Sequence, residues 1–143
     1  MSARRDLTPA VLALLTVGAG SGCAAQSCEG VYLSPGVHLD AGAWAAGGLD
    51  PTSITATICL AGVCKPATGT KPDDLGLWTD LPTGPVSVRV QLTAADGRTL
   101  DVSMTTQAQT FKPLGAGCGG RTEIALVVSK SGTLTASKPG SLG

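Results

Sequence analysis

Hydrophobic and polar residues alternate with a period of two through most of residues 36–136. The clearest run is 86–93, which places Val or Leu at every even position and Ser, Arg, Gln or Thr at every odd one. The runs 54–60, 100–105 and 122–128 show a similar pattern. Successive side chains of a strand point to opposite faces, so each run predicts a strand with one buried and one solvated face.

Shorter runs and turn signals extend this pattern. Three of them predict further strands, at 37–40, 75–81 and 133–136. Asp96 and Gly97 form a strong hairpin signal, whereas residues 41–48 fit either a loop or one or two helical turns. About seven or eight short strands with frequent turns predict an all-β fold, a small antiparallel β-sandwich over residues 36–136. In architecture this pattern is similar to immunoglobulin-like and fibronectin-type modules.

The first 22 residues have the features of an export signal rather than of a folded segment. Arg4 and Arg5 supply positive charge, and the apolar stretch 9–20 follows them. A stretch of about a dozen residues matches the hydrophobic part of a signal peptide, whereas a membrane-spanning helix needs about 20. The chain is therefore divided into a signal peptide, a linker, the sandwich and a flexible tail, over 1–22, 23–35, 36–136 and 137–143.

The signal ends in Gly20, Ser21 and Gly22, and Cys23 follows it; these four residues resemble the lipobox of bacterial lipoproteins. In that family small residues precede a Cys, a lipid is attached to its thiol, and the peptide is cut just before it. The resemblance implies that Cys23 is the lipidated residue and that the lipid anchors the protein to the extracytoplasmic face of the cell membrane. The alternative is an ordinary signal cut after Ala25, which would release a secreted protein.

Cysteine usage supports an oxidising compartment. The chain has five Cys, at positions 23, 28, 59, 64 and 118. If Cys23 carries lipid, four remain for two disulfides, and their spacing lacks the C-x₂-C pairs of a zinc site. Cys59 and Cys64 flank a two-residue turn, so they should face one another with Cα atoms about 4.5 Å apart. We therefore expect the disulfides Cys59–Cys64 and Cys28–Cys118, with the other two pairings left open.

Composition excludes several function classes. Charged residues make up only 14% of the chain, with 10 basic and 10 acidic residues, so nothing favours binding to nucleic acid or another polyanion. His38 is the only His, which excludes a multi-His metal centre. Its place in an alternating strand favours a solvent-facing residue over a catalytic base. Aromatic residues are only 3% of the chain, so the core must be mainly aliphatic.

Acidic residues and tryptophans are the remaining candidates for chemistry. Asp73, Asp74 and Asp80 could help to hold Ca²⁺, but they lack the ordered spacing of a calcium loop, and a solvated acidic turn is favoured. Trp44 and Trp78 could form a platform for a sugar, although tryptophans in a domain poor in rings are more often core anchors.

A glycosidase-type acid/base pair is a further possibility, since Asp40 and Asp50 could supply two carboxylates. Nothing in the sequence brings these carboxylates together, so we assign no catalytic, cofactor-binding or metal-binding residue. The sequence predicts an exported lipoprotein whose sandwich is a non-catalytic binding or structural module at the cell surface. Its partner would be an unidentified envelope protein or glycan. The alternative is a secreted carbohydrate-binding domain or hydrolase that uses Asp and Trp residues.

Overall fold

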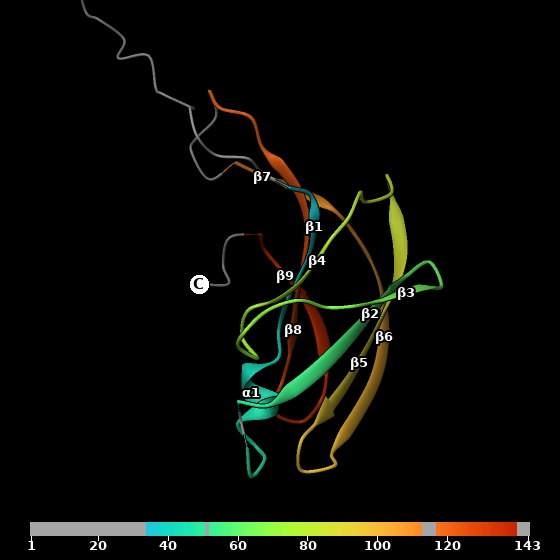
Figure 1. Cartoon of the computed structure of the whole chain (residues 1–143). Coiled ribbons are helices and arrows are strands. Elements are labelled where there is room, and N and C mark those ends of the chain that lie inside the picture. The colour runs from blue at the N-terminus through green and yellow to red at the C-terminus, as the bar shows by residue number, and fades with distance from the viewer. Residues whose placement is uncertain (1–33, 51, 113–116, 140–143) are drawn as a thin grey trace, which may run out of the picture.

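A computed structural model of the chain describes residues 34–50, 52–112 and 117–139. Within these residues, nine strands form two sheets that pack face to face (Figure 1). One short helix lies between the first two strands in the chain. The predicted all-β sandwich is confirmed. The predicted signal peptide and the lipidation site Cys23 lie outside the described residues, as does most of the predicted linker and the end of the tail.

The first sheet, called sheet A here, has five strands. In order they are β4 (Leu75–Trp78), β1 (Gly36–Asp40), β8 (Arg121–Val128) and β7 (Gln109–Phe111), and β9 (Leu134–Ser137) also pairs with β8. β1 runs parallel to β8, whereas the other pairs are antiparallel. A parallel pair needs a long crossover connection, and here the chain forms all of the second sheet between these two strands.

The second sheet, sheet B, has four strands and is antiparallel throughout. In order they are β3 (Val63–Pro66), β2 (Ile54–Leu60), β5 (Pro85–Ala94) and β6 (Thr99–Gln107). The turn at Asp96 and Gly97 joins β5 to β6 as predicted, with Gly97 at φ +89°. The left-handed backbone there is readily adopted by Gly.

One strand differs from the sequence prediction, and one segment that the sequence left open is now assigned. β4 ends at Trp78 instead of continuing to residue 81, because the chain leaves sheet A after Thr79 and crosses to sheet B, where β5 begins. The segment 41–48 contains α1 (Gly42–Ala45), a single helical turn. This turn brings Trp44 into the end of the core.

The core lies between the two sheets and is mainly aliphatic. Val88 and Val90 of β5, on one side, and Leu39 and Leu126 of sheet A, on the other, are completely buried. The polar residues that alternate with them on β5 face solvent or lie at the surface. The alternation in the sequence therefore assigned the core-facing side of β5 correctly. The predicted solvated face is wrong for the middle of β8, where Glu123 and Ala125 are buried as well as Ile124 and Leu126.

Gly36 is required by the close approach of β1 and β4. A Cβ atom at this position would lie 2.5 Å from the carbonyl oxygen of Leu77 and 3.0 Å from Cε3 of Trp78. We expect Gly36→Ala to push the two strands apart and to lower the free energy of unfolding by about 1–3 kcal/mol. Urea denaturation would measure the loss. Gly119→Ala is the matched control, since a Cβ there would meet nothing within 4 Å. Equal stability of the two variants would contradict the prediction.

Candidate functional site

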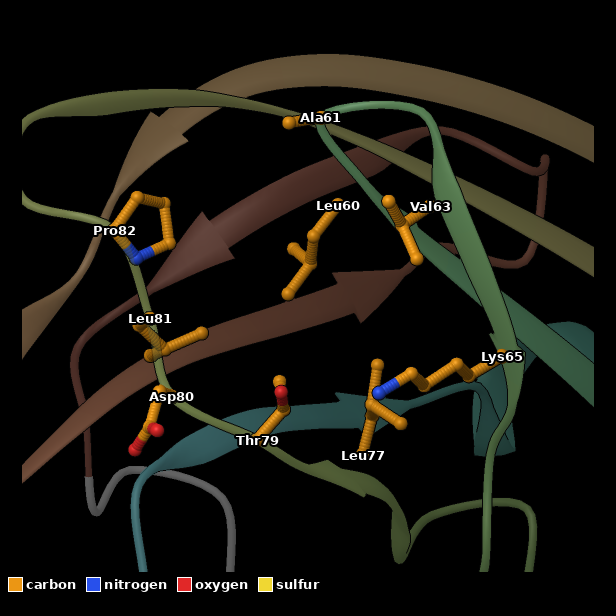
Figure 2. Close-up of a pocket in the computed structure, with 9 residues that line it drawn as sticks. All are labelled: Leu60, Ala61, Val63, Lys65, Leu77, Thr79, Asp80, Leu81 and Pro82. Carbon is orange, nitrogen blue, oxygen red and sulfur yellow. The ribbon is translucent and has the colours of Figure 1, made fainter.

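An apolar pocket opens on one side of the sandwich, between the edge strands β3 and β4. Its volume is about 430 Å³ (Figure 2). The lining comes from the β2–β3 hairpin, from β4 and from the segment that crosses back to sheet B: Leu60, Ala61, Val63, Lys65, Leu77, Thr79, Asp80, Leu81 and Pro82. Because β3 and β4 belong to different sheets, the space between them is an uncovered part of the sandwich interior.

The pocket exists because, among the described residues, no strand of sheet A covers the inner side of β3. Val63 and Lys65 alternate with Cys64 and line the pocket, yet Val63 remains 62% exposed. The floor is formed by Leu60 and the buried Leu77. The result is an apolar surface that is shaped by strands but is only partly filled by the described residues.

A backbone bridge closes the gap between the two edges beyond the pocket. Thr68 follows β3, and its N–H donates to the carbonyl oxygen of Gly76 in β4 at 2.7 Å. The N–H of Gly76 donates in return to the carbonyl oxygen of Thr68, also at 2.7 Å. The edges are therefore joined at one end and separated at the pocket.

The pocket contains two charged groups and one hydroxyl. In Figure 2 the ammonium of Lys65 extends toward Leu77, whereas the carboxylate of Asp80 points away from Leu60 and Leu77. Neither Lys65 nor Asp80 takes part in any ion pair found within the described part of the chain. Thr79 adds its hydroxyl to the lining. An apolar cavity with a few polar groups is the usual character of a small-molecule site.

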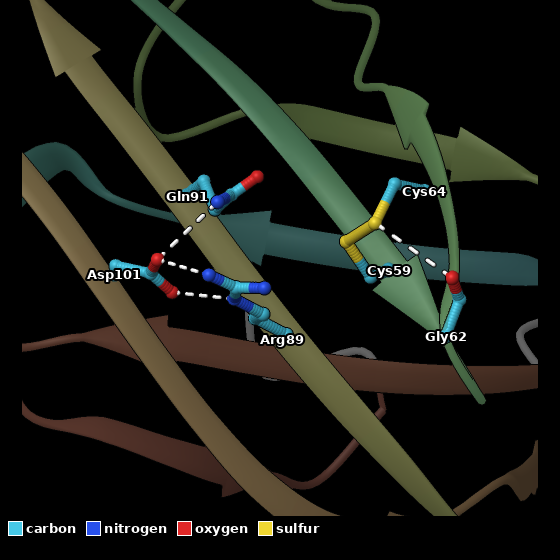
Figure 3. Close-up of a disulfide and its surroundings, with 6 residues drawn as sticks. All are labelled: Cys59, Gly62, Cys64, Arg89, Gln91 and Asp101. Atoms are coloured by element: carbon cyan, nitrogen blue, oxygen red, sulfur yellow. Dashed lines mark hydrogen bonds and ion pairs between the residues drawn. A yellow bond between two sulfur atoms is a disulfide. The ribbon is translucent and has the colours of Figure 1, made fainter.

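The hairpin that carries Val63 and Lys65 is held by the predicted disulfide Cys59–Cys64 (Figure 3). The two residues are directly opposite in the β2–β3 register, and their Cα atoms are 3.9 Å apart, slightly closer than expected. Ala61 and Gly62 form the two-residue turn, with φ values of +48° and +85°. Positive φ at both positions is the signature of a type I′ turn, whose twist matches that of the strands.

The second predicted disulfide, Cys28–Cys118, lies partly outside the described residues because Cys28 does. Cys118 itself is buried and is disulfide-bonded. An immunoglobulin-type bond between Cys59 and Cys118 is excluded, since Cys59 is joined to Cys64.

A second group of polar residues lies on the outer face of sheet B. Arg89 donates from Nε to Oδ1 of Asp101 at 2.7 Å and also bonds Oδ2 through its terminal nitrogen, and Gln91 donates to Oδ2 at 3.2 Å (Figure 3). These hydrogen bonds, with that of Arg89 first, lower the pKa of Asp101 to about 2. The carboxylate is thus held as an anion in a cross-strand ion pair between β5 and β6, which is a structural role.

This ion pair makes a prediction about acid stability. The folded pKa of Asp101 lies below its unfolded value of about 3.9, so its contribution to stability is complete above pH 4 and is lost as the pH falls toward 2. We expect Asp101→Asn to be less stable than the wild type at neutral pH and equally stable near pH 2. Urea denaturation from pH 7 to pH 2 would measure both proteins. A difference that does not change with pH would contradict this prediction.

The structure does not bring the predicted acidic candidates together. Oδ1 of Asp74 lies 3.1 Å from Nε2 of His38, at hydrogen-bond distance, whereas Asp80 lines the pocket. Within the described ranges, no group of three or more His, Cys, Asp or Glu side chains is placed to hold a metal ion. The side chain of His38 is on the outer face as expected, but it is only 17% exposed.

The two carboxylates of the possible acid/base pair are each bound to a nearby residue. Asp40 accepts a hydrogen bond from the backbone N–H of Gly42 at 2.9 Å. Asp50 accepts from the backbone N–H and the hydroxyl of Thr52, at 3.0 and 2.7 Å, and these bonds lower its pKa. Each carboxylate therefore stabilises its own turn, which is a common role of Asp.

The two tryptophans have different environments. Trp44 is a core anchor as predicted, at 6% exposure. Trp78 is 56% exposed, so the expectation of a second core anchor is wrong. It follows the buried Leu77 on β4 and therefore points to the outer face of sheet A. There its ring lies against two glycines, since a Cβ at Gly36 or Gly76 would approach it to 3.0 or 3.5 Å.

Comparisons with known proteins add no assignment: no family model, no curated protein and no solved structure matches the chain. Among the described residues, none of the helical segments is long and apolar enough to span a bilayer. Sequence reasoning did not find the pocket. Val63, Leu77 and Leu81 carry only a hydrophobic signal, and the strand order that places them around one opening is not visible in the sequence.

Proposed function

We propose that the protein is an exported lipoprotein whose sandwich is a non-catalytic binding module at the cell surface, and that the pocket between β3 and β4 is its binding site. One observation carries this proposal: an apolar pocket of about 430 Å³ lies open at the edge of an otherwise well-packed core. Its size is within the range of about 300–1,000 Å³ that is typical of small-molecule sites.

Two further features support the proposal. The disulfide Cys59–Cys64 is the kind of bond that persists in an oxidising, extracytoplasmic compartment. The apolar stretch 9–20 and the lipobox-like residues before Cys23 are consistent with export and anchoring. A lipid at Cys23 would hold the sandwich beside the membrane on its extracytoplasmic side.

The pocket is tested with a neutral fluorescent probe, N-phenyl-1-naphthylamine. We expect saturable binding with one site per chain, and we expect Val63→Asp to abolish it because a carboxylate would replace an apolar wall. Leu49→Asp is the matched control: Leu49 is also an exposed hydrophobic residue, at 94%, but it is not in the lining. Binding that survives Val63→Asp, or is lost equally in the control, would contradict the proposal.

The exposed ring of Trp78 favours a second candidate function, glycan binding. A flat ring on the outer face of a sheet can stack on a sugar. The neighbouring Gly36 and Gly76 have no side chains that would cover the exposed Trp78 ring. Titration with soluble β-glucan or chitin oligosaccharides should then change the tryptophan fluorescence, and Trp78→Ala should remove the change. A wild-type signal that does not respond would exclude this function for those sugars.

A further inference from the structure

We infer that the pocket between β3 and β4 takes a single-chain aliphatic carboxylate, a fatty acid, with its alkyl chain between the two sheets and its carboxylate on Lys65. This inference rests on the proposed function, since it names the ligand of the same site. Three observations carry it: the character of the walls, the placement of the charges and the state of the two strand edges.

The walls are suited to an unbranched apolar chain. Leu60, Leu77 and Leu81 approach the middle of the pocket from β2, β4 and the crossing segment (Figure 2). Val63 and Pro82 extend the apolar surface at the rim. Burial of these surfaces against an alkyl chain would remove apolar area from water on both partners, which favours binding.

The placement of charge favours an anionic head group. Lys65 extends its ammonium over the pocket, and within the described part of the chain it has no ion-pair partner. Asp80, the only acidic residue in the lining, directs its carboxylate away from the apolar centre. A ligand carboxylate can therefore meet Lys65 with little opposition from Asp80, and the hydroxyl of Thr79 offers a further donor.

The strand edges argue against an extended peptide as the ligand. An added strand would need a row of backbone donors and acceptors along β3 or β4. On β3, Pro66 has no N–H to donate. On β4, the N–H and carbonyl oxygen of Gly76 are already bonded to Thr68. Little edge remains for a peptide, whereas an alkyl chain needs no backbone hydrogen bonds.

The experiment compares two probes that differ in head-group charge: sodium decanoate and decyltrimethylammonium, both below their micelle concentrations. Displacement of N-phenyl-1-naphthylamine from the disulfide-intact protein gives both affinities. We expect decanoate to bind about tenfold more tightly or better, because an ammonium–carboxylate contact is a charge-assisted hydrogen bond. Lys65→Gln should remove this preference, Lys65→Arg should keep most of it, and Lys130→Gln, in the distant β8–β9 turn, should leave it unchanged.

The possible results separate this inference from the proposed function. If both probes displace the dye equally, the pocket binds apolar chains but the carboxylate assignment is wrong. If decanoate is preferred but the preference survives Lys65→Gln in a protein with an unchanged amide spectrum, the assignment to Lys65 is wrong. If neither the dye nor decanoate binds, both the inference and the proposed function fail.

Discussion

Replacement of Trp44 by Ala should lower the free energy of unfolding by about 3–5 kcal/mol, the usual cost of deleting a buried aromatic side chain. Trp44 is 6% exposed and packs into the core from α1. Since the other core residues are mainly small and aliphatic, they cannot fill the space that the indole would leave.

Arg98 makes this position more sensitive than burial alone implies. Its guanidinium carbon lies 4.6 Å from the centre of the Trp44 ring. Its two terminal nitrogens donate to the carbonyl oxygens of Trp44 and Ala45 at 3.1 and 3.2 Å. The indole is therefore part of the contact that joins α1 to the β5–β6 hairpin, and its removal should loosen that end of the sandwich.

Urea denaturation followed by far-ultraviolet circular dichroism would measure the effect. Trp78→Ala is the matched control, because it removes the same side chain from a position that is 56% exposed. Its expected cost is about 1 kcal/mol or less. A similar loss of stability in both variants would show that Trp44 is not the principal anchor.

Cys23→Ser should abolish membrane association. If Cys23 carries the lipid, the lipid is bonded to its sulfur as a thioether, and a Ser at this position has no sulfur to form that bond. The protein should then leave the membrane fraction while Cys59 and Cys64 remain bonded. Fractionation of cells and intact mass of the mature protein, with and without reductant, would report the acyl chains, the cut site and the disulfides together.

Ser27→Ala is the control for this experiment, since it changes a residue of the same amino-terminal segment but leaves the predicted anchor and every Cys in place. It should remain with the membrane fraction. Membrane retention of Cys23→Ser would contradict the anchoring hypothesis. A wild-type mass that corresponds to a chain beginning at Gln26 would instead support ordinary secretion.

The parts of the fold that were predicted depend on local patterns. Residues 86–93 alternate so regularly that the buried face of β5 could be assigned without a structure. Cys59 and Cys64 are separated by 5 positions, and the type I′ turn between them largely determines their pairing. Such features involve neighbours in the sequence, so little information about the rest of the chain is needed.

The parts that were not predicted depend on distant segments. Trp78 has the same hydrophobic signal as Trp44, yet only one of them meets the core, because β4 presents Leu75 and Leu77 to it instead. The parallel pairing of β1 with β8 joins segments more than 80 positions apart, and no residue pattern in the sequence predicts it. The carboxylates at 40 and 50 each bond to their own turn, so their proximity in the sequence did not imply a shared site.

By itself, the sequence determined the class of fold, the core-facing side of β5, the β2–β3 hairpin and its disulfide. These follow from periodicity and turn chemistry, which act over a few residues. Only the tertiary structure decided that β3 and β4 are edges of different sheets. That order leaves Val63 and Lys65 without a covering strand and opens the pocket, because a cavity is defined by which surfaces fail to meet, and this depends on the packing of the whole chain.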